Sequence, residues 1–217
     1  MDLAIGWKDF SCAPANVPEF APIDTISYAT SKCALGLILV ARNPKGVCAI
    51  SIGDDRIYLE TDLAAAFPKA TLIANLIAVE EDLAKVLHFL ERPADGFQLA
   101  LDIRGTPLQR RVWEKLRAIS VGRTVTYMEL ARRISPFASP RVVARACAAN
   151  RIALAIPCHR AIRSREDACG YRWGAERKRE LIKMEARVRS HVLAAASERR
   201  AETSDTRVSS VGLRGAD

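Results

Sequence analysis

The stretch that decides the fold runs from residue 106 to residue 149 and reads TPLQRRVWEKLRAISVGRTVTYMELARRISPFASPRVVARACAA. Three helix starts lie in it, each with a hydroxyl side chain that can cap free backbone amides: Thr106, Thr126 and Ser139. The first two are capping boxes, because Gln109 and Glu129 stand three residues later, and proline follows the first and the third. Two short helices joined by a tight turn, within residues 126–149, are typical of a helix-turn-helix.

Basic residues are concentrated in the half of the chain that carries these helices. Residues 101–217 hold 25 Lys and Arg, 22 of them Arg, against 12 Asp and Glu, a net charge of +13. Residues 1–100 hold 8 basic and 13 acidic residues, a net charge of −5. A genomic bias towards arginine would raise the basic count but would not place the acidic residues in the other half. Because the planar guanidinium suits contacts to phosphates and bases, this distribution predicts a nucleic-acid partner.

The acidic half has the pattern of a small α/β unit. Apolar runs rich in β-formers, turn residues such as Pro44 and Gly46, and one amphipathic helical stripe follow one another along it. We expect, in chain order, strands at 33–41 and 47–52, a helix at 55–67, a strand at 70–74, a helix at 76–90 and a strand at 97–103. No catalytic constellation lies in this half, so its expected role is that of a scaffold.

The predicted fold is therefore an α/β N-terminal subdomain, a small sheet with helices, followed by a mainly helical C-terminal subdomain that contains the helix-turn-helix and a reactive cysteine. We place the first at residues 23–103 and the second at 104–190. Residues 1–22 are expected to form a flexible arm and residues 191–217 a disordered tail.

The bulk features predict a soluble cytoplasmic protein without a metal. No apolar run is long enough to span a bilayer, and no basic segment followed by an apolar stretch marks a secretory leader. The six cysteines and three histidines show no Cys-x-x-Cys spacing, so we expect free thiols and no metal site.

A cysteine and a histidine stand side by side after the apolar run Ile152–Ile156. The sequence there is Pro157-Cys158-His159-Arg160, and a neighbouring histidine or arginine favours the thiolate, the nucleophilic form of cysteine. The run predicts a buried strand, on which adjacent side chains point to opposite faces. Contact between His159 and Cys158 would then require a turn after Pro157 or a bridging water. The other interpretation is a buried structural thiol beside a core histidine.

A carboxylate falls on the apolar stripe of the last helix. Glu185 lies four residues after Leu181 and three after Ile182, so it shares their face. A carboxylate on such a face requires a partner. His159 would be one, and the two would complete a Cys–His–Glu relay. An exposed pair with Arg189, one turn further on, fits the spacing equally well.

These stretches resemble the methylated-DNA–protein-cysteine methyltransferases, most closely the C-terminal half of the Ada-type bacterial proteins. Three segments carry the resemblance: Ala148-Ala149-Asn150, Ile156-Pro157-Cys158-His159-Arg160, and Gly170-Tyr171-Arg172-Trp173-Gly174 with Arg177-Lys178. It begins near Ser27 and ends near Arg187, so it covers both subdomains. It implies DNA repair by direct reversal: an O6-alkylguanine is flipped from the duplex and its alkyl group moves irreversibly to a cysteine, once per molecule and without a cofactor. O4-methylthymine is a second candidate substrate.

The resemblance also implies the catalytic residues. Cys158 would accept the alkyl group, and His159 would act as its base through a water. Glu185 would orient that histidine. Asn150 would fix the turn between the recognition helix and the segment that carries the cysteine.

The implied partner is double-stranded DNA containing O6-alkylguanine, bound by a monomer that places its helix-turn-helix in the minor groove. Tyr127 would contact the extruded nucleotide, and Arg141 would be the finger that fills the gap left in the duplex. Tyr171 and Arg172 would lie on the loop that lines the base pocket, where backbone groups recognise guanine.

The chain departs from the family pattern at two turns. Residues 164–167 read Ser-Arg-Glu-Asp where the family has a glycine-rich turn, and Cys169 stands where serine is common. The turn at 135–140 lacks the usual glycine. Both changes bear on the size of the pocket and the mobility of its loop, and so on the range of alkyl groups accepted.

Three other functions fit parts of the pattern. A cysteine hydrolase would need an oxyanion hole and would turn over. A lesion-binding protein of the same fold would bind alkylated bases and transfer nothing, although such relatives lack the acceptor cysteine. A sequence-specific transcription factor would explain the helix-turn-helix but would leave the Pro-Cys-His-Arg motif unused.

Overall fold

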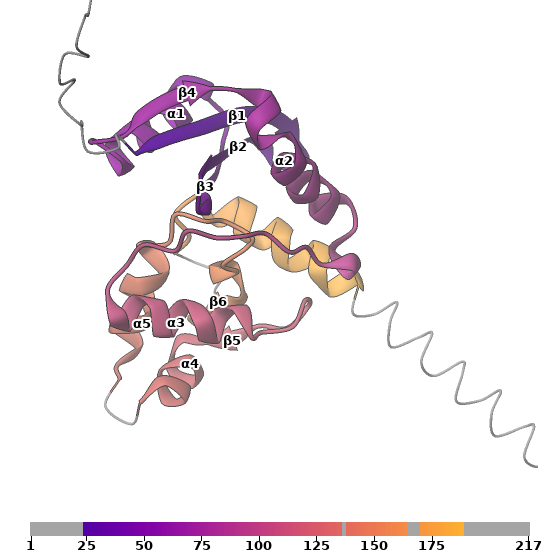
Figure 1. Ribbon diagram of the computed structural model, residues 1–217. Coiled ribbons are helices and arrows are strands. Elements are labelled where there is room, and N and C mark those ends of the chain that lie inside the picture. Colours follow the sequence, from indigo (N-terminus) through magenta and orange to yellow (C-terminus); the bar gives the residue numbers. More distant parts are fainter. Residues whose placement is uncertain (1–23, 136–137, 165–169, 189–217) are drawn as a thin grey trace, which may run out of the picture.

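The chain folds into an upper part built on a sheet and a lower part built from helices (Figure 1). The computed structural model describes residues 24–135, 138–164 and 170–188. The predicted arm at 1–22 and the predicted tail at 191–217 lie outside these residues. The fold class predicted from the sequence is confirmed.

A four-stranded sheet forms the upper part. Its strands are β1 (Thr25–Cys33), β2 (Gly36–Asn43), β3 (Gly46–Gly53) and β4 (Thr71–Ala74). They are arranged in the order β3-β2-β1-β4: β2 is antiparallel to both β3 and β1, and β4 is parallel to β1. The predicted turn between β2 and β3 is confirmed. Gly46 has a φ of 137° there, and a Cβ atom would lie 2.3 Å from the Ala100 carbonyl oxygen, so only glycine fits.

Two predicted strands were wrong. The run at 33–41 is broken by a turn, so it spans the end of β1 and most of β2. Residues 97–103 form no strand: Leu101 makes an isolated bridge to Val47, and Val47 N–H donates to Ala100 O at 2.8 Å. This segment is an extended connection whose apolar side chains alternately face the core, which gives the same sequence pattern as a strand.

Two helices cover opposite faces of the sheet: α1 (Arg56–Ala66) and α2 (Leu76–Glu91). Leu39 of β2 packs in a cluster with Leu59 of α1, whereas its neighbour Ile38 points to the other face, into a cluster that contains Val86 of α2. The helices predicted at 55–67 and 76–90 are confirmed, as is the strand at 70–74.

The lower part is built from four helices: α3 (Pro107–Arg117), α4 (Tyr127–Ile134), α5 (Pro140–Ala148) and a last helix at 175–188. The three predicted helix starts are confirmed, since two capping boxes open α3 and α4, and the Ser139 side chain accepts from Val142 N–H at α5. Trp113 of α3 donates from Nε1 to the Ala146 carbonyl of α5 at 2.8 Å. A short parallel pair, β5 (Val125–Thr126) with β6 (Ala161–Ile162), ties α4 to the segment after the cysteine.

One apolar core joins the two parts. It contains Ile50 of β3 and Val86 of α2 together with Leu116 of α3 and Val143 of α5. Because the core is shared, it does not test the predicted boundary between the two subdomains, which was placed between residues 103 and 104 and stays a prediction. Among the described helices, none combines the length and the apolar character required to cross a bilayer.

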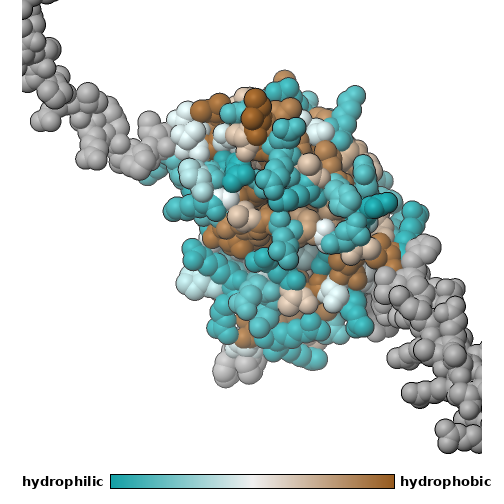
Figure 2. All heavy atoms as spheres, turned by 45° about the vertical axis from the view of Figure 1, so that its right-hand side comes forward, coloured by the Kyte–Doolittle hydropathy of each residue, from teal (hydrophilic) through white to brown (hydrophobic). Residues whose placement is uncertain are grey.

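On the face shown in Figure 2, hydrophilic side chains predominate, with apolar patches between them. Most of the large apolar side chains that are exposed belong to α1, β4 and the first turn of α2: Ile57, Tyr58, Ile73, Leu76 and Ile77.

Candidate active site

The segment that carries Cys158 is a tight turn, so the predicted buried strand was wrong. Ile152 makes an isolated bridge to Ile50 of β3, and the chain then turns, with Ile156 N–H donating to Ile152 O at 3.1 Å. Leu154 has a φ of 65°, which is unusual for so bulky a side chain. The run is apolar because it is almost wholly buried, and apolar composition does not distinguish a buried turn from a buried strand.

A single 3-10 turn, η2 (Cys158–Arg160), follows Pro157. It supplies the turn that the adjacent cysteine and histidine require. Both side chains are buried, with Cys158 3% exposed and His159 0% exposed.

Asn150 ties this turn to the end of α5. Its side chain is fully buried. Nδ2 donates to the Ile156 carbonyl at 2.9 Å and to Cys158 Sγ at 3.2 Å, and Oδ1 accepts from Ile152 N–H at 2.9 Å. The amide therefore fixes the position of the thiol and offers a hydrogen bond that favours its charged form.

Burial is the dominant influence on the Cys158 thiol and raises its pKa to about 11. The hydrogen bond from Asn150 and the positive charge of Lys178 act in the opposite direction but do not outweigh burial. At neutral pH the resting thiol is consequently protonated, so attack on an electrophile requires a base that removes the proton as the reaction proceeds.

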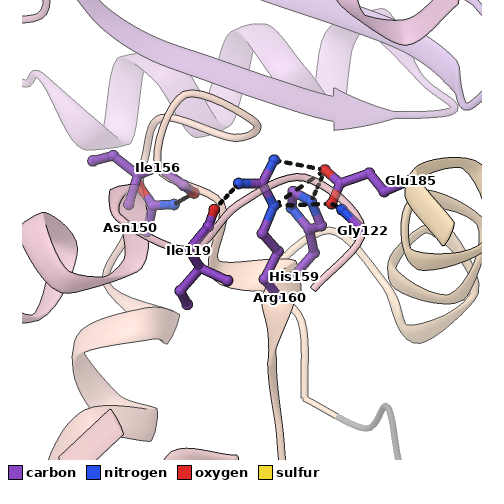
Figure 3. Close-up of polar contacts among 7 residues, drawn as sticks. All are labelled: Ile119, Gly122, Asn150, Ile156, His159, Arg160 and Glu185. Atoms are coloured by element: carbon purple, nitrogen blue, oxygen red, sulfur yellow. Dashed lines mark hydrogen bonds and ion pairs between the residues drawn. The ribbon is translucent and has the colours of Figure 1, made fainter. Parts of the chain in front are cut away.

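Three ionisable side chains, His159, Arg160 and Glu185, form a buried cluster (Figure 3). His159 Nε2 lies 2.9 Å from Glu185 Oε1. Arg160 donates from Nη2 to Oε1 at 2.8 Å and from Nε to Oε2 at 2.9 Å, and Gly122 N–H donates to Oε2 at 3.1 Å. Arg160 also donates to the Ile119 carbonyl. Both oxygens of the carboxylate therefore accept hydrogen bonds, from two side chains of η2 and from the backbone of Gly122.

The charge states follow from these contacts. Burial alone would raise the pKa of Glu185, but the hydrogen bonds and charges of His159 and Arg160 hold it at about 2. Burial, aided by the positive charges of Arg160 and Lys178, lowers the pKa of His159 although Glu185 acts in the opposite direction. At neutral pH an ionised carboxylate thus faces a neutral imidazole. Because the carboxylate can only accept, the proton lies on Nε2 and Nδ1 is left with a free lone pair.

His159 Nδ1 is the basic atom of this relay. It is buried and has no hydrogen-bond partner among the residues that the structure describes. Glu185 is 2% exposed, so the alternative of an exposed pair is wrong for this carboxylate, and Arg189 lies outside the described residues. Leu181 shares the buried face with Glu185, as the stripe predicted.

Cys158 lines a pocket of about 280 Å³. The other lining residues come from α4, α5 and the segments that flank 165–169: Tyr127, Ala144, Cys147, Ala148, Arg163, Gly170, Tyr171 and Arg172. The Tyr171 ring lies edge-on to His159, with 6.3 Å between the ring centroids. The structure therefore brings Tyr127, Tyr171 and Arg172 to one pocket with the cysteine, while Cys169 and most of the altered turn at 164–167 lie outside the described residues.

Lys178 contacts two walls of the pocket, the Tyr127 ring and the loop at 170–172. It is fully buried, and Nζ donates to the Ala161 carbonyl at 2.6 Å and lies 5.6 Å from the centre of the Tyr127 ring. The Gly170 carbonyl accepts from Tyr127 Oη at 3.4 Å and from Lys178 Nζ at 3.5 Å. Lys178 thus places a positive charge beside the thiol and a donor on the pocket loop.

Of the four residues predicted to contact DNA or the base, Tyr127, Tyr171 and Arg172 line the pocket and Arg141 does not. It is exposed in the first turn of α5. Sequence analysis assigned no role to Arg160 or Lys178, although both stand in the motifs that carry the resemblance. Neither has a spacing signal, because Arg160 pairs with a carboxylate 25 residues away and Lys178 donates to backbone carbonyls, which any residue carries.

A larger cavity of about 360 Å³ lies on the other side of Pro157 and Arg160. It is lined mainly by the connection 96–101 and by apolar side chains, and its lining includes no cysteine, serine or histidine from the described part of the chain. Of the two cavities, only the smaller has a nucleophile, a base and an orienting carboxylate beside it.

Several known proteins are similar to this chain. Residues 107–187 match the family model of the 6-O-methylguanine DNA methyltransferase DNA-binding domain. The bifunctional transcriptional activator/DNA repair enzyme Ada of Escherichia coli is 42% identical over 161 residues, which cover 74% of this chain and 46% of that protein. A methylated-DNA–protein-cysteine methyltransferase of Candida albicans is 34% identical, over 73% of this chain and 93% of that protein. The chain spans about half the length of the two bacterial Ada relatives.

Solved structures agree with these matches. The O6-methylguanine methyltransferase of Mycobacterium tuberculosis is 27% identical, with a TM-score of 0.62 and coverage of 74% of this chain and 93% of that one. The same protein in complex with DNA gives 27% identity and a TM-score of 0.58, over 75% and 94% of the two chains.

Proposed function

This chain belongs to the family of methylated-DNA–protein-cysteine methyltransferases, and from that premise we propose that it repairs O6-alkylguanine in double-stranded DNA by moving the alkyl group irreversibly onto Cys158. One observation carries the proposal. A buried thiol lines a pocket and precedes a histidine that has one free nitrogen and whose other nitrogen faces an ionised carboxylate.

The alkylated base has to leave the duplex to reach that thiol. An O6-alkyl group inside the stack is inaccessible, and extruding the base costs a few kcal/mol. The exposed Arg141 at the start of α5 is suited to fill the gap, with α4 and α5 as the helix-turn-helix in the minor groove. Arginine contacts to phosphates would supply affinity without a sequence preference, which a search for lesions requires.

The extruded guanine would enter the pocket between Tyr127 and the loop at 170–172. Tyr127 would contact the nucleotide, and Tyr171 and Arg172 would supply backbone groups that recognise the base. The hydrogen bond from Tyr127 to the Gly170 carbonyl supports this reading, because it joins the two walls of the pocket.

Transfer then follows from the charge states at the site. His159 Nδ1 takes the thiol proton through a water, and Glu185 stabilises the imidazolium that forms. The thiolate attacks the alkyl carbon in line: the S–C bond forms, the C–O bond breaks, and guanine leaves with the electron pair and takes up a proton. The thioether has no route back to the thiol. The protein would therefore act only once. We expect it to do so as a monomer in the cytoplasm, without a cofactor.

The test is the mass of the protein after incubation with one equivalent of duplex containing O6-methylguanine. We expect a gain of one methyl group, located on the peptide that contains Cys158, with guanine restored in the DNA and no second turnover. O4-methylthymine duplex, offered in parallel, tests the second substrate.

Cys158→Ala is the negative control, and Cys147→Ala is its matched control because Cys147 is the other described thiol that lines the pocket. Binding of the lesion without any gain in mass would assign the chain to the lesion-binding proteins. Methyl transfer to Cys147 in the wild type would displace Cys158 as the acceptor.

A further inference from the structure

Arg172 extends away from the base-pocket loop to the N-terminal part of the chain. Its Nη2 donates to Asp62 Oδ1 at 2.7 Å. Asp62 lies in the middle of α1, 110 residues earlier in the sequence. Arg172 also lines the pocket that holds Cys158, so one residue touches both the pocket and the helix on the far side of the sheet.

A second arginine repeats the connection where the loop enters the last helix. Arg177 donates from Nε to the Leu35 carbonyl at 2.8 Å, in the turn between β1 and β2, and pairs with Asp54 after β3. Its Nη1 donates to the Trp173 carbonyl at 3.0 Å, so the same guanidinium also holds the loop backbone. Residues 172–177 are therefore attached to the N-terminal part at two points.

These contacts are better suited to positioning than to stability. The side chains of Arg172 and Asp62 are 30% and 27% exposed, and ion pairs of that kind contribute little to the free energy of unfolding. An ion pair of low stability can nevertheless restrict position. A guanidinium held by a carboxylate limits where the backbone of its own residue can lie. Within the pocket, Gly170 and Tyr171 directly precede Arg172, so its position fixes theirs.

We propose that the Arg172–Asp62 ion pair is a positioning contact through which helix α1 of the N-terminal part holds the wall of the base pocket. This inference rests on the proposed function. It gives the N-terminal part, which contains α1, a role in the reaction. It also assigns two roles to Arg172: the residue lines the pocket, and its side chain anchors the loop to α1 rather than contacting DNA.

The test uses the full chain in four variants. Asp62→Asn and Arg172→Gln each remove the ion pair, and the double variant Asp62→Arg with Arg172→Asp restores it with the charges exchanged. Glu60→Gln is the matched control, because Glu60 lies on the same helix with a similar exposed fraction, 29%, and pairs with Arg56 of α1 itself.

Single-turnover methyl transfer measured over a range of protein concentrations separates the limiting rate constant from the half-saturating concentration. We expect each single variant to lower the limiting rate constant roughly tenfold, as loss of reactive alignment does. Glu60→Gln should stay within about threefold of wild type, and the exchanged pair should recover part of the rate that Arg172→Gln loses. Affinity for undamaged duplex should stay unchanged in Asp62→Asn and Glu60→Gln. Hydrogen exchange of the peptide covering 170–178 should be faster in both single variants.

A different pattern overturns the proposal. An unchanged rate and unchanged hydrogen exchange in Asp62→Asn would show that the pair positions nothing. An exchanged pair as slow as Arg172→Gln would mean that the arginine acts by direct contact with DNA. Failure of the proposed function is distinct: the wild type would then transfer no methyl group, whereas hydrogen exchange would still report whether Asp62 holds the loop.

Discussion

At the scale of single residues, His159 sets the pH dependence of the reaction. Burial lowers its pKa below the ordinary 6.5, so the neutral base is present throughout the neutral range and is lost only at lower pH. We expect the single-turnover rate constant to be level from about pH 7 to about pH 9 and to fall in acid. In His159→Gln the rate should instead follow the Cys158 thiolate, rising about tenfold per pH unit towards the pKa of about 11.

His88→Gln is the control for that comparison, because His88 is half exposed and pairs with Asp95 in the N-terminal part. Its profile should coincide with that of the wild type. Parallel profiles for wild type and His159→Gln would contradict the assignment of His159 as the base.

The residues of the site were largely predictable because their chemistry is specific. Cys158, His159 and Asn150 were found through motifs, and Glu185 through the anomaly of a carboxylate on an apolar stripe. Arg160 was not, since a sequence does not show that its guanidinium lies against the same carboxylate. Long-range pairing of charges depends on how elements pack, which local patterns do not encode.

At the scale of elements, the first turn of α5 carries a prediction about duplex DNA. Arg141 is exposed and lies outside the pocket, so its proposed task is to stabilise the extruded state. Arg141→Ala should lower the rate of transfer from O6-methylguanine in duplex DNA by roughly tenfold or more, since extrusion costs a few kcal/mol that the arginine partly offsets. Transfer from the free alkylated base should not change.

Arg92→Ala removes the same charge from an exposed position in the N-terminal part and should affect neither substrate. An equal loss with duplex and free base in Arg141→Ala would instead indicate damage to the pocket. A loss in Arg92→Ala alone would place the DNA on the other part of the molecule.

Helices were predicted more accurately than strands, for a physical reason. A capping box is local, so Thr106 with Gln109 and Thr126 with Glu129 mark their helix starts within four residues. A strand depends on its neighbours: residues 25–33 are rich in polar side chains but pair with β2 and β4, whereas the alternating segment 97–103 has a single bridge. The strand predicted at Ile152–Ile156 was wrong for a related reason: the segment is apolar because it is buried, but it forms a turn.

At the scale of the whole molecule, charge and core divide the chain differently. The apolar core runs through both parts, so folding of one depends on packing against the other. The net charge, in contrast, changes sign between the two halves of the sequence: it is −5 for residues 1–100 and +13 for residues 101–217. The C-terminal half of the chain therefore attracts a polyanion and the N-terminal half repels it, which orients the protein before any specific contact forms.

That asymmetry predicts the salt dependence of binding to undamaged DNA. Each phosphate neutralised by an arginine contributes about 0.9 to the slope of log affinity against log salt concentration. Replacing the exposed Arg132 and Arg133 of α4 by glutamine should therefore make the slope shallower by about 1.8. The double variant should weaken binding to unrelated duplex sequences equally, since phosphate contacts carry no sequence information. Arg56→Gln with Arg92→Gln, an equal loss of charge from the N-terminal part, should leave the slope as it is. The measurement is the dissociation constant of two unrelated duplexes at several salt concentrations. An identical slope in both double variants would mean that net charge, rather than the face formed by α4, governs binding.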